Sequence, residues 1–434
     1  MQATKTVKKY ETYKDSGIEW IGEIPQDWKV LPHKYILSKV KNICEKYAGE
    51  DIISLTMKGV IKRDLDNPMG KMPLTFDGYQ RIEAGNLLLC LFDIDVTPRC
   101  VGLIKDNGLT SPAYSQFEFL GLDCPQYYTY LLTMIDDDKC FLHLAKNLRS
   151  SLTEDNFGAI LTIQPTVKEQ QVIADYLDKK WGDIDRVVEA EKSVIEKLKE
   201  YKQSIITEAV TKGLDKSVPL KDSGIEWIGK IPQHWKVIKL KYLSTSIGDG
   251  IHSTPNYDDS GDIYFVNGNN IGQDNLIFKE DTKKINLAEF ENYNKPNLSE
   301  NTIFITLNGA TYGKTSFYNG EIVLLGKSAG YVTLNKEQNK KYIRYYLQSN
   351  VAKFIMDLSL SGTTIANLSL ATLNDFTVTY PSLIVQQQIA EYLDKKCSEI
   401  DKAIADKEQL IKKFTEYKKS LIYECVTGKR KVVV

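Results

Sequence analysis

The sequence predicts an α+β protein in which two mixed α/β segments are joined by two long helices that pack antiparallel as a coiled coil, with an internal pseudo-two-fold repeat. Three observations predict this fold: a doubled block at the start of each half, a second doubled block before a long helical stretch, and strand-rich segments between the blocks. The 434 residues suit about two to four domains. The 42% hydrophobic and 26% charged residues are the balance of a soluble globular protein.

Two blocks of sequence each occur twice. The block KDSGIEWIGEIPQDWKV at 14–30 returns as KDSGIEWIGKIPQHWKV at 221–237, with 15 of 17 residues identical at an offset of 207 (221 − 14). The block QQVIADYLDKK at 170–180 returns as QQQIAEYLDKK at 386–396, with nine of eleven identical at an offset of 216 (386 − 170). Internal repeats of this length identify a tandem duplication.

The two halves, about 14–213 and 221–428, differ in their central inserts at 31–164 and 238–380. The inserts share only a thin outline of strands and turns. A protein with one substrate needs one insert, whereas a protein that recognises two different targets needs two. The pattern therefore favours a protein with two distinct recognition segments on one repeated frame.

The stretch 168–212 and its repeat are helical by composition, with apolar residues at three- and four-residue steps. The expected packing stripe is Val187, Val194, Leu198, Tyr201 and Ile205 on the first helix and Leu410, Phe414, Tyr417 and Leu421 on the second. Gly182 and Asp183 predict a bend, so a straight helix of about 30 residues, or roughly 45 Å, is expected after them. Since the second helix must return toward the first insert, we expect an antiparallel pair with one head at each end. Ordinary helix-pair packing would give the same stripe.

The inserts are predicted to be mixed α/β, because short apolar runs alternate with Gly, Asn and Asp turns. The expected strands lie at 52–57, 86–92, 117–120, 263–266, 302–307 and 322–325. Helices are expected at 125–147 and 337–357, late in each insert.

Composition narrows the class of protein. The longest apolar run, at 87–92, is too short to span a bilayer, and no apolar stretch follows the basic N-terminus. Seven cysteines at irregular spacings form no C-x-x-C pair, which favours reduced thiols in the cytoplasm. The net charge of −1 is unusual for a chain that binds nucleic acid alone. Such a chain must concentrate its cations on one face or rely on a partner's charge.

Motifs for catalysis are missing. The sequence has no Pro-Pro pair, no G-x-G-x-x-G turn and no Pro-Asp dipeptide, so the usual methyltransferase and nuclease signatures do not occur. The segment NGATYGKT at 308–315 resembles a phosphate-binding loop, but its first glycine is one residue too close and a strand-like stretch follows it. A strand–turn–strand loop that carries Lys314 is the better interpretation. The sequence therefore predicts no metal or cofactor site in this chain.

Polar and basic residues in the inserts are the candidates for DNA contact. Asn and Gln suit adenine edges, and Lys and Arg suit phosphates and guanine. The candidates are Lys58, Lys62, Arg63, Arg81, Arg99, His252, Ser253, Thr254, Asn267, Asn269, Asn270, Gln273, Lys314 and Lys327. A solvated surface position is the alternative interpretation of each residue, and for the asparagines it is the satisfaction of turn backbones.

The whole chain resembles the specificity subunit of a type I restriction–modification enzyme. The resemblance rests on D-S-G-I-E-W-I-G-x-I-P-x-x-W at 15–28 and 222–235, and on P-x(4)-Q-Q-x-I-A-x-Y-L-D before a long helix at 165–178 and 381–394. Gly362-Thr363-Thr364 also resembles a family loop, which adds Thr363 and Thr364 to the candidates. The first insert departs from that loop, so its role there is open.

The resemblance implies two target-recognition domains at 13–164 and 216–380, and two spacer helices at 165–215 and 381–428. Each domain would recognise half of a bipartite, asymmetric site in double-stranded DNA. The helices would set the unread spacer and dock two methyltransferase subunits that methylate adenine N6. The resemblance places S-adenosylmethionine, ATP and Mg on the methyltransferase and the motor/endonuclease partners, and none of them on this chain.

Two other hypotheses are compatible with the residues. An orphan or regulatory subunit would recognise DNA and support methylation only, which the neighbouring genes would show. A fused methyltransferase–nuclease with an unfamiliar site would methylate DNA alone, which labelled S-adenosylmethionine would detect. The missing motifs favour a non-catalytic subunit over this enzyme.

Overall fold

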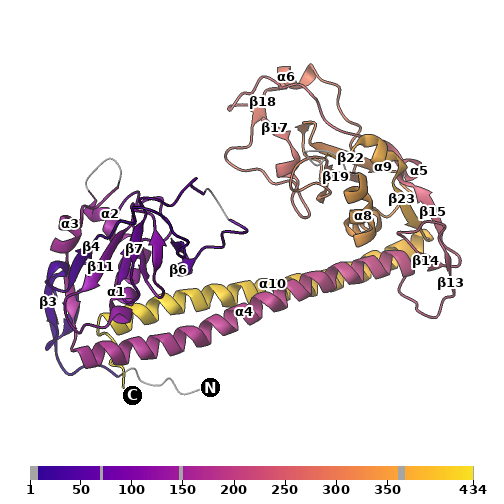
Figure 1. The fold of residues 1–434 in the computed structure, drawn as a ribbon. Coiled ribbons are helices and arrows are strands. Elements are labelled where there is room, and N and C mark those ends of the chain that lie inside the picture. The colour runs from indigo at the N-terminus through magenta and orange to yellow at the C-terminus, as the bar shows by residue number, and fades with distance from the viewer. Residues whose placement is uncertain (1–7, 69–71, 146–149, 360–366, 434) are drawn as a thin grey trace. The chain divides into compact units, whose positions relative to one another are not determined.

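The computed structural model describes residues 8–68, 72–145, 150–359 and 367–433, and the chain divides into two compact units (Figure 1). Unit 1 contains 1–191 with 409–434, and unit 2 contains 192–408. The boundary falls within both long helices, α4 (Val167–Lys212) and α10 (Leu383–Val426). Each unit therefore contains one insert and part of each helix.

Helix α4 begins with a capping box and ends at a glycine. Thr166 and Glu169 exchange hydrogen bonds between side chain and backbone N–H, at 3.3 and 3.2 Å. Gly213 follows the last turn with φ +76°, the left-handed conformation that glycine adopts at little cost. The break or bend predicted at Gly182 and Asp183 does not interrupt the helix, because α4 continues through both. A single exposed glycine costs a helix only about 1 kcal/mol, which 46 residues of mostly good helix formers outweigh.

Unit 1 is built from short strands and three short α-helices around a four-stranded sheet in the order β4-β11-β8-β9. Its strands are β1 (Tyr13–Asp15), β2 (Glu23–Pro25), β3 (Lys29–Pro32), β4 (Leu37–Val40), β5 (Ile53–Thr56), β6 (Gly59–Lys62), β7 (Gln80–Ile82), β8 (Leu87–Leu89), β9 (Val101–Leu103), β10 (Gly108–Thr110), β11 (Ser115–Phe119) and β12 (Leu161–Gln164). Its other helices are η1 (His33–Tyr35), α1 (Pro125–Asp137), α2 (Cys140–Leu144) and α3 (Glu154–Ala159).

Unit 2 has a four-stranded sheet in the order β16-β22-β19-β20 and a three-stranded sheet in the order β18-β17-β21. Its strands are β13 (Leu220–Asp222), β14 (Lys230–Pro232), β15 (Lys236–Lys239), β16 (Ser244–Gly248), β17 (Ile263–Val266), β18 (Lys284–Ile285), β19 (Thr302–Thr306), β20 (Thr315–Phe317), β21 (Val323–Leu325), β22 (Ala329–Leu334) and β23 (Thr377–Tyr380). Its other helices are α5 (Leu240–Leu243), η2 (Gly268–Asn270), α6 (Leu287–Glu291), α7 (Lys340–Gln348), α8 (Asn350–Ser359) and α9 (Leu370–Asp375).

The six predicted strands are all present, each within three residues of its expected ends. The two predicted insert helices are each divided in two. The first breaks at Lys139, which has φ +53°, between α1 and α2. The second breaks at Ser349, whose hydroxyl accepts from the N–H of Ala352 at 3.3 Å and so begins a new helix, α8.

The hydrophobic core of each unit contains the repeated tryptophan. Trp28 in unit 1 and Trp235 in unit 2 are both 1% exposed. Trp235 lies against Gly213 at the end of α4, where an added Cβ would be 3.2 Å from the indole ring. Trp28 lies in the same way against Gly428 at the end of α10, at 3.1 Å. The C-terminal end of each long helix therefore packs against a first repeat block: α4 against the block of unit 2, and α10 against the block of unit 1.

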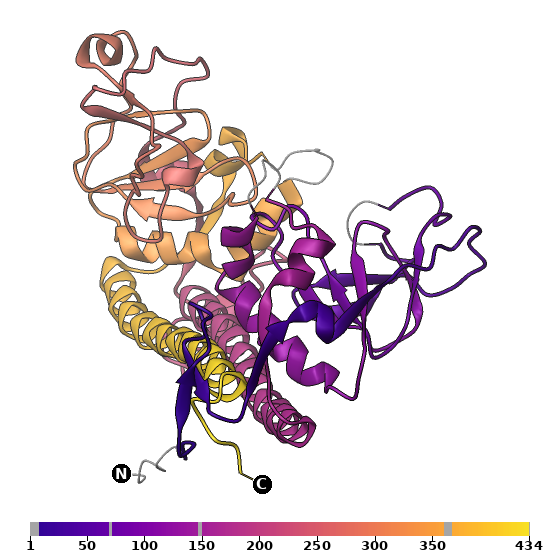
Figure 2. The same cartoon turned by 90° about the vertical axis from the view of Figure 1, so that its left-hand side faces the viewer.

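The N-terminal hairpin of unit 1, β1 and β2, lies beside the segment that follows α10 (Figure 2). The N–H of Lys431 donates to the carbonyl of Lys8 at 2.8 Å, and the Tyr13 hydroxyl donates to the carbonyl of Gly428 at 3.1 Å. In unit 2 the corresponding hairpin, β13 and β14, follows α4 directly in the chain. The hairpin is therefore joined to the end of a long helix by the chain itself in unit 2, and by hydrogen bonds in unit 1.

Candidate nucleic-acid interface

Polar loops of unit 2 gather at one edge of its β-structure. The antiparallel register places the ends of β16 and β19 beside the starts of β20 and β22. The bonds that join the loops there are Ile251 N–H to Leu325 O (2.8 Å), Gly326 N–H to Val266 O (2.8 Å), Leu307 N–H to Ser328 O (2.9 Å) and Gly268 N–H to Ser328 Oγ (2.9 Å). Loops at one edge of a rigid sheet are a usual place for recognition residues. We call this edge the loop edge of unit 2.

The predicted asparagines do not all have the same environment. Asn267, Asn269 and Asn270 belong to the η2 turn on the loop edge. The side chains of Asn267 and Asn270 bond to neighbouring turns, whereas Asn269 is exposed. Gln273 points elsewhere: its amide nitrogen is 3.5 Å from the Asp401 carboxylate on α10. The structure therefore separates Gln273 from the other three.

Lys314 and Lys327 lie on exposed turns of the loop edge, between β19 and β20 and between β21 and β22. Among the described residues, no carboxylate lies within ion-pair distance of either ammonium group. The predicted strand–turn–strand arrangement around Lys314 is confirmed, because Ile305 pairs with Thr315 in the antiparallel register. Both lysines are thus available for a phosphate.

His252 is exposed at the side of a depression of about 490 Å³ in unit 2 and bonds through Nε2 to the Asp249 carboxylate at 2.8 Å. Ser253 and Thr254 follow it on the exposed chain after β16. The depression is also lined by Asn292, Asn294, Tyr293 and Lys295, so it offers donors and acceptors together. Thr363 and Thr364 lie outside the described residues.

In unit 1 the basic candidates mostly have acidic partners. Lys62 is 2.6 Å from Asp51, and Arg81 is 2.6 Å from Glu50. The backbone N–H of Ala48, followed by the Arg81 guanidinium, keeps the pKa of the Glu50 carboxyl below its usual range. Arg81, Glu50 and Asp51 line a depression of about 390 Å³.

Two further candidates of this insert, Lys58 and Arg63, lie near Lys62 in sequence. The backbone N–H of Arg63 donates to the carbonyl of Ile52 at 2.7 Å. Lys58 is exposed in the β5–β6 turn, and no described side chain forms an ion pair with it. Of the basic candidates in unit 1, Lys58 is therefore the one most like Lys314 and Lys327.

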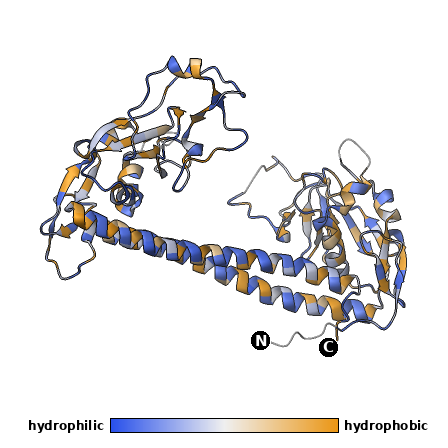
Figure 3. Cartoon of the chain, turned by 180° about the vertical axis from the view of Figure 1, so that it is seen from behind, coloured by the Kyte–Doolittle hydropathy of each residue, from blue (hydrophilic) through white to orange (hydrophobic). Residues whose placement is uncertain are grey.

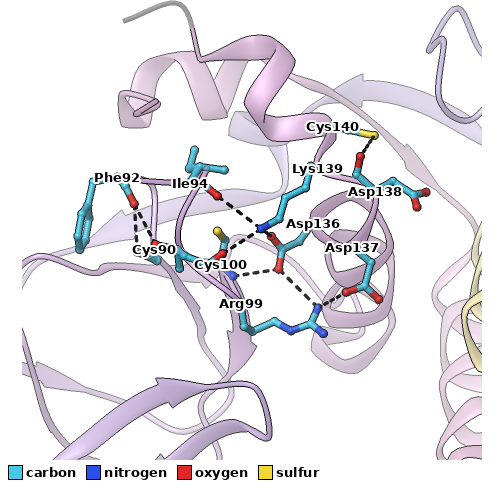
Figure 4. A network of polar contacts seen from close by, with 11 residues as sticks. Cys90, Phe92, Ile94, Arg99, Cys100, Asp136, Asp137, Asp138, Lys139 and Cys140 are labelled. Carbon is cyan, nitrogen blue, oxygen red and sulfur yellow. Dashed lines mark hydrogen bonds and ion pairs between the residues drawn. The ribbon is translucent and has the colours of Figure 1, made fainter. Parts of the chain in front are cut away.

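Arg99 belongs to a buried network between β8 and α1 (Figure 4). Its guanidinium is 2.9 Å from Asp137 and 3.5 Å from Asp136, and the guanidinium side chain is only 14% exposed. Asp136 also accepts from the backbone N–H of Cys100 at 2.9 Å, and Lys139 donates to the carbonyl of Thr97 at 2.9 Å. Since removal of one member would leave a buried charge unpaired, the network holds the β8–β9 loop on α1. Because the Arg99 side chain is only 14% exposed and already pairs with two carboxylates, Arg99 is a weaker candidate for a phosphate contact than the exposed lysines.

The β8–β9 loop corresponds to the β19–β20 loop of unit 2 by its place in the sheet. That loop also contacts the following helix, since the Tyr312 hydroxyl bonds to the Asp357 carboxylate on α8 and Lys353 is 3.2 Å from the same carboxylate. Each unit therefore fixes the loop beside its four-stranded sheet with charged side chains. The partners differ between the units, as the inserts themselves differ.

The buried seam of the long helices differs from the predicted stripe. Buried or half-buried positions alternate by four and three residues: Ile184, Val188, Glu191, Ile195, Leu198, Lys202, Ile205 and Ala209 on α4, and Ile400, Ile404, Lys407, Ile411, Phe414, Lys418, Leu421 and Cys425 on α10. This spacing is a heptad pattern. Of the predicted stripe, Leu198, Ile205, Phe414 and Leu421 lie at these positions. Figure 3 shows the alternation of hydrophobic and hydrophilic residues along both helices.

The other predicted seam residues are exposed, so their assignment to the seam is wrong. Tyr201 is 58% exposed and Tyr417 is 47% exposed, and Val187, Val194 and Leu410 are also exposed. Each precedes a seam position by one residue, which is the g position of the heptad. We call these exposed g positions the outer stripe of the helices; Val187, Leu410 and Tyr417 lie in unit 1, and Val194 and Tyr201 lie in unit 2.

Two equivalent ion pairs join the helices, one within each unit. In unit 2, Lys202 is 2.6 Å from Asp401, and in unit 1, Lys418 is 2.5 Å from Asp185. Both members are related by the offset of 216, and the Lys418 ammonium also lies 4.4 Å from the centre of the Trp181 ring. Sequence reasoning missed these pairs, although a Lys and an Asp at matching places in both repeats were a visible signal. The pairs fix the antiparallel direction of the helices in each unit.

The seven cysteines are all free and buried, as predicted for reduced thiols. Burial raises the pKa of the Cys100 thiol, and the nearby Asp136 carboxylate raises it further. A thiol with a raised pKa is a poor nucleophile. Among the residues that the structure describes, no group of three or more His, Cys, Asp or Glu side chains could hold a metal ion. In the same residues, no helix is long and apolar enough to cross a bilayer.

Comparisons with known proteins agree with this architecture. A family model described as "Type I restriction modification DNA specificity domain" matches residues 232–412. The chain is 23% identical over 442 residues to a putative type I restriction enzyme MjaX specificity subunit of Methanocaldococcus jannaschii, covering 95% of this chain and 96% of that protein.

Two solved structures share the fold. One is a chain from a study of complex assembly and conformational transition of the type I R-M system, with a TM-score of 0.67 and 12% identity over 93% of this chain and 98% of that chain. The other is the HsdS subunit from Thermoanaerobacter tengcongensis, with a TM-score of 0.50 and 13% identity over 93% of this chain and 98% of that chain.

The family match over part of the chain, the full-length relative and the shared fold agree: the chain is similar to type I restriction–modification specificity subunits.

Proposed function

We propose that the chain recognises a bipartite, asymmetric site in double-stranded DNA, with one half-site for each insert. The observation that carries this proposal is that two different inserts occupy equivalent places on one repeated frame, and that their central sheets have matching strand orders. The target-recognition domains are 13–164 and 216–380, and the spacer helices are 165–215 and 381–428. The loop edge of unit 2 and the depression around Arg81 in unit 1 are the proposed DNA-facing surfaces.

The chain acts without catalysis of its own. Partner methyltransferase subunits bind S-adenosylmethionine and methylate adenine N6, and motor/endonuclease subunits use ATP and Mg to translocate and cut DNA. The absence of methyltransferase and nuclease motifs in the sequence supports this division of labour. The complex works in the cytoplasm.

The outer stripe of the helices is the proposed docking surface for the methyltransferase subunits. Val187, Val194 and Tyr201 on α4, with Leu410 and Tyr417 on α10, leave apolar surface in water although the seam beside them is buried. Exposed apolar positions with heptad spacing suit another helix. A partner that docks there would also supply the positive charge that a chain of net charge −1 lacks.

The experiment is to map methylated adenines in the DNA of a host that expresses the chain with its methyltransferase partner. We expect one motif made of two short specific half-sites separated by unread positions. A continuous motif, or methylation that does not change when the chain is left out, would refute the proposal. Challenge of the same host with unmethylated phage DNA shows whether restriction accompanies methylation or whether methylation occurs alone.

A further inference from the structure

The η2 turn of unit 2 is fixed internally by one of its own asparagines. The Asn270 side-chain oxygen accepts from the N–H of Asn267 at 2.9 Å, and the Asn270 side-chain nitrogen donates to the carbonyl of Ile277 at 3.0 Å. Both ends of the Asn270 amide are therefore engaged with backbone. Its role is to hold the turn, and it is not free to bond to a base.

Ser328, from the β21–β22 turn, fixes the same η2 turn from outside. Its hydroxyl donates to the Asn267 side-chain oxygen at 3.0 Å and accepts from the N–H of Gly268 at 2.9 Å. On the other side, the Thr306 hydroxyl donates to the carbonyl of Gly268 at 3.2 Å. The packing has no spare room, because a Cβ on Gly326 would lie 2.4 Å from the Asn267 side-chain oxygen. The η2 turn is therefore held from two sides, by Ser328 of the β21–β22 turn and by Thr306 of β19.

Asn269 is the exposed residue of this fixed turn. Its neighbours Gly268 and Asn270 are buried and half-buried, and none of the described residues forms a hydrogen bond with its side chain. A free carboxamide on a rigid turn can bond bidentately to N6 and N7 of adenine. Lys327, next to Ser328 in the chain, is exposed on the same edge and suits a neighbouring phosphate. A rigid support lowers the entropy cost of the contact, which favours discrimination between bases.

We propose that Asn269 is a base-recognising side chain of unit 2, with adenine as its partner, and that Ser328 is the residue that positions it. This inference rests on the proposed function. It separates the three asparagines of the turn: Asn269 contacts DNA, while Asn267 and Asn270 support it.

The test uses the complex with its methyltransferase partner and a panel of DNA duplexes, each with one base pair of the mapped site changed. Asn269→Ala is expected to lose about 10- to 100-fold discrimination at one adenine-containing base pair, with the other positions unchanged. The matched control is Asn319→Ala, an exposed asparagine in the β20–β21 turn at the opposite edge, which should leave every position unchanged.

Ser328→Ala is expected to relax discrimination at the same base pair partly and to leave the other positions unchanged. If Asn269→Ala leaves the preference profile unchanged, the assignment of Asn269 is overturned. If Ser328→Ala lowers the melting temperature but leaves the profile unchanged, Ser328 is a stabilising residue and its positioning role is overturned. Failure of the proposed function has a different signature, because the wild-type complex itself would then show no preferred base pair in the half-site of unit 2.

Discussion

Removal of Lys314 and Lys327 together should weaken DNA binding without changing its sequence preference. Both lysines are exposed on the loop edge, and no carboxylate among the described residues forms an ion pair with either of them. Each lysine is therefore expected to neutralise one phosphate. Each phosphate contact contributes about 0.9 to the slope of log affinity against log salt, so the double alanine variant should lose about 1.8 from the slope. When the salt concentration is raised from about 50 to 200 mM, the affinity of the wild type and that of the variant should both fall. The factor for the wild type should be roughly 12 times the factor for the variant.

The assay is fluorescence anisotropy of the assembled complex on specific and unrelated duplexes at four salt concentrations. The matched control is Lys239→Ala, since the Lys239 side chain is 44% exposed in the same unit but already lies 2.9 Å from Asp375. The control should change the slope by less than about half of the value expected for one phosphate contact. An unchanged slope in the double variant, or a loss confined to the specific duplex, would show that these lysines do not contact phosphate.

Three further predictions concern the frame. Charge reversal of Lys418 and Asp185 should show coupling of about 0.5–1 kcal/mol in a double-mutant cycle measured by urea unfolding, since Asp185 is largely exposed, and zero coupling would contradict the ion pair. Burial lowers the pKa of His33 from 6.5 to about 4. The neutral ring therefore contributes stability that is complete above pH 6.5 and is lost as the pH falls toward 4, by up to about 3 kcal/mol. His33→Leu, the residue that Leu240 represents in the repeat, should remove this dependence in acid unfolding, and a persistent dependence would assign it to other groups. Insertion of four residues into α4 after Asp183 adds about 6 Å, so the unread spacer in the methylation motif should grow by one or two base pairs with both half-sites retained. An unchanged spacer would refute the proposal that the helices set the spacer length.

The repeated blocks made the frame predictable from sequence. Trp28 and Trp235 recur because each must fill the same core against the glycine that ends a helix, so their identity is fixed by packing. The strands were found because their apolar runs are bounded by turn residues. Cys397 and Cys425 are buried at the places that Trp181 and Ala209 occupy in the repeat.

The seam itself was assigned to the wrong side for several residues, because the g positions carry side chains as apolar as those of the seam. Val187 and Val188 are adjacent and chemically equal, and only the register against the other helix decides which is buried. Lys202 and Lys418 occupy seam positions because an aspartate on the facing helix lies within reach, which composition alone does not predict.

The candidate recognition residues show the same limit. A sequence reveals that a residue can hydrogen-bond but not whether a neighbour already satisfies it. Asn269 and Asn270 are identical in type, and only the fold brings Ile277 to Asn270 and leaves Asn269 exposed. Arg99 is a basic loop residue in sequence, and the acidic end of α1 that pairs with it lies 37 residues away.

The most direct test of the central claim is an exchange of one insert. Residues 238–380 are replaced by the matching insert of a relative with a known motif, and methylated adenines are mapped in a host that expresses the hybrid with its methyltransferase partner. We predict that one half-site changes to that of the relative while the other half-site stays the same. A motif in which both half-sites change together, or neither changes, would contradict recognition by two independent inserts on one repeated frame.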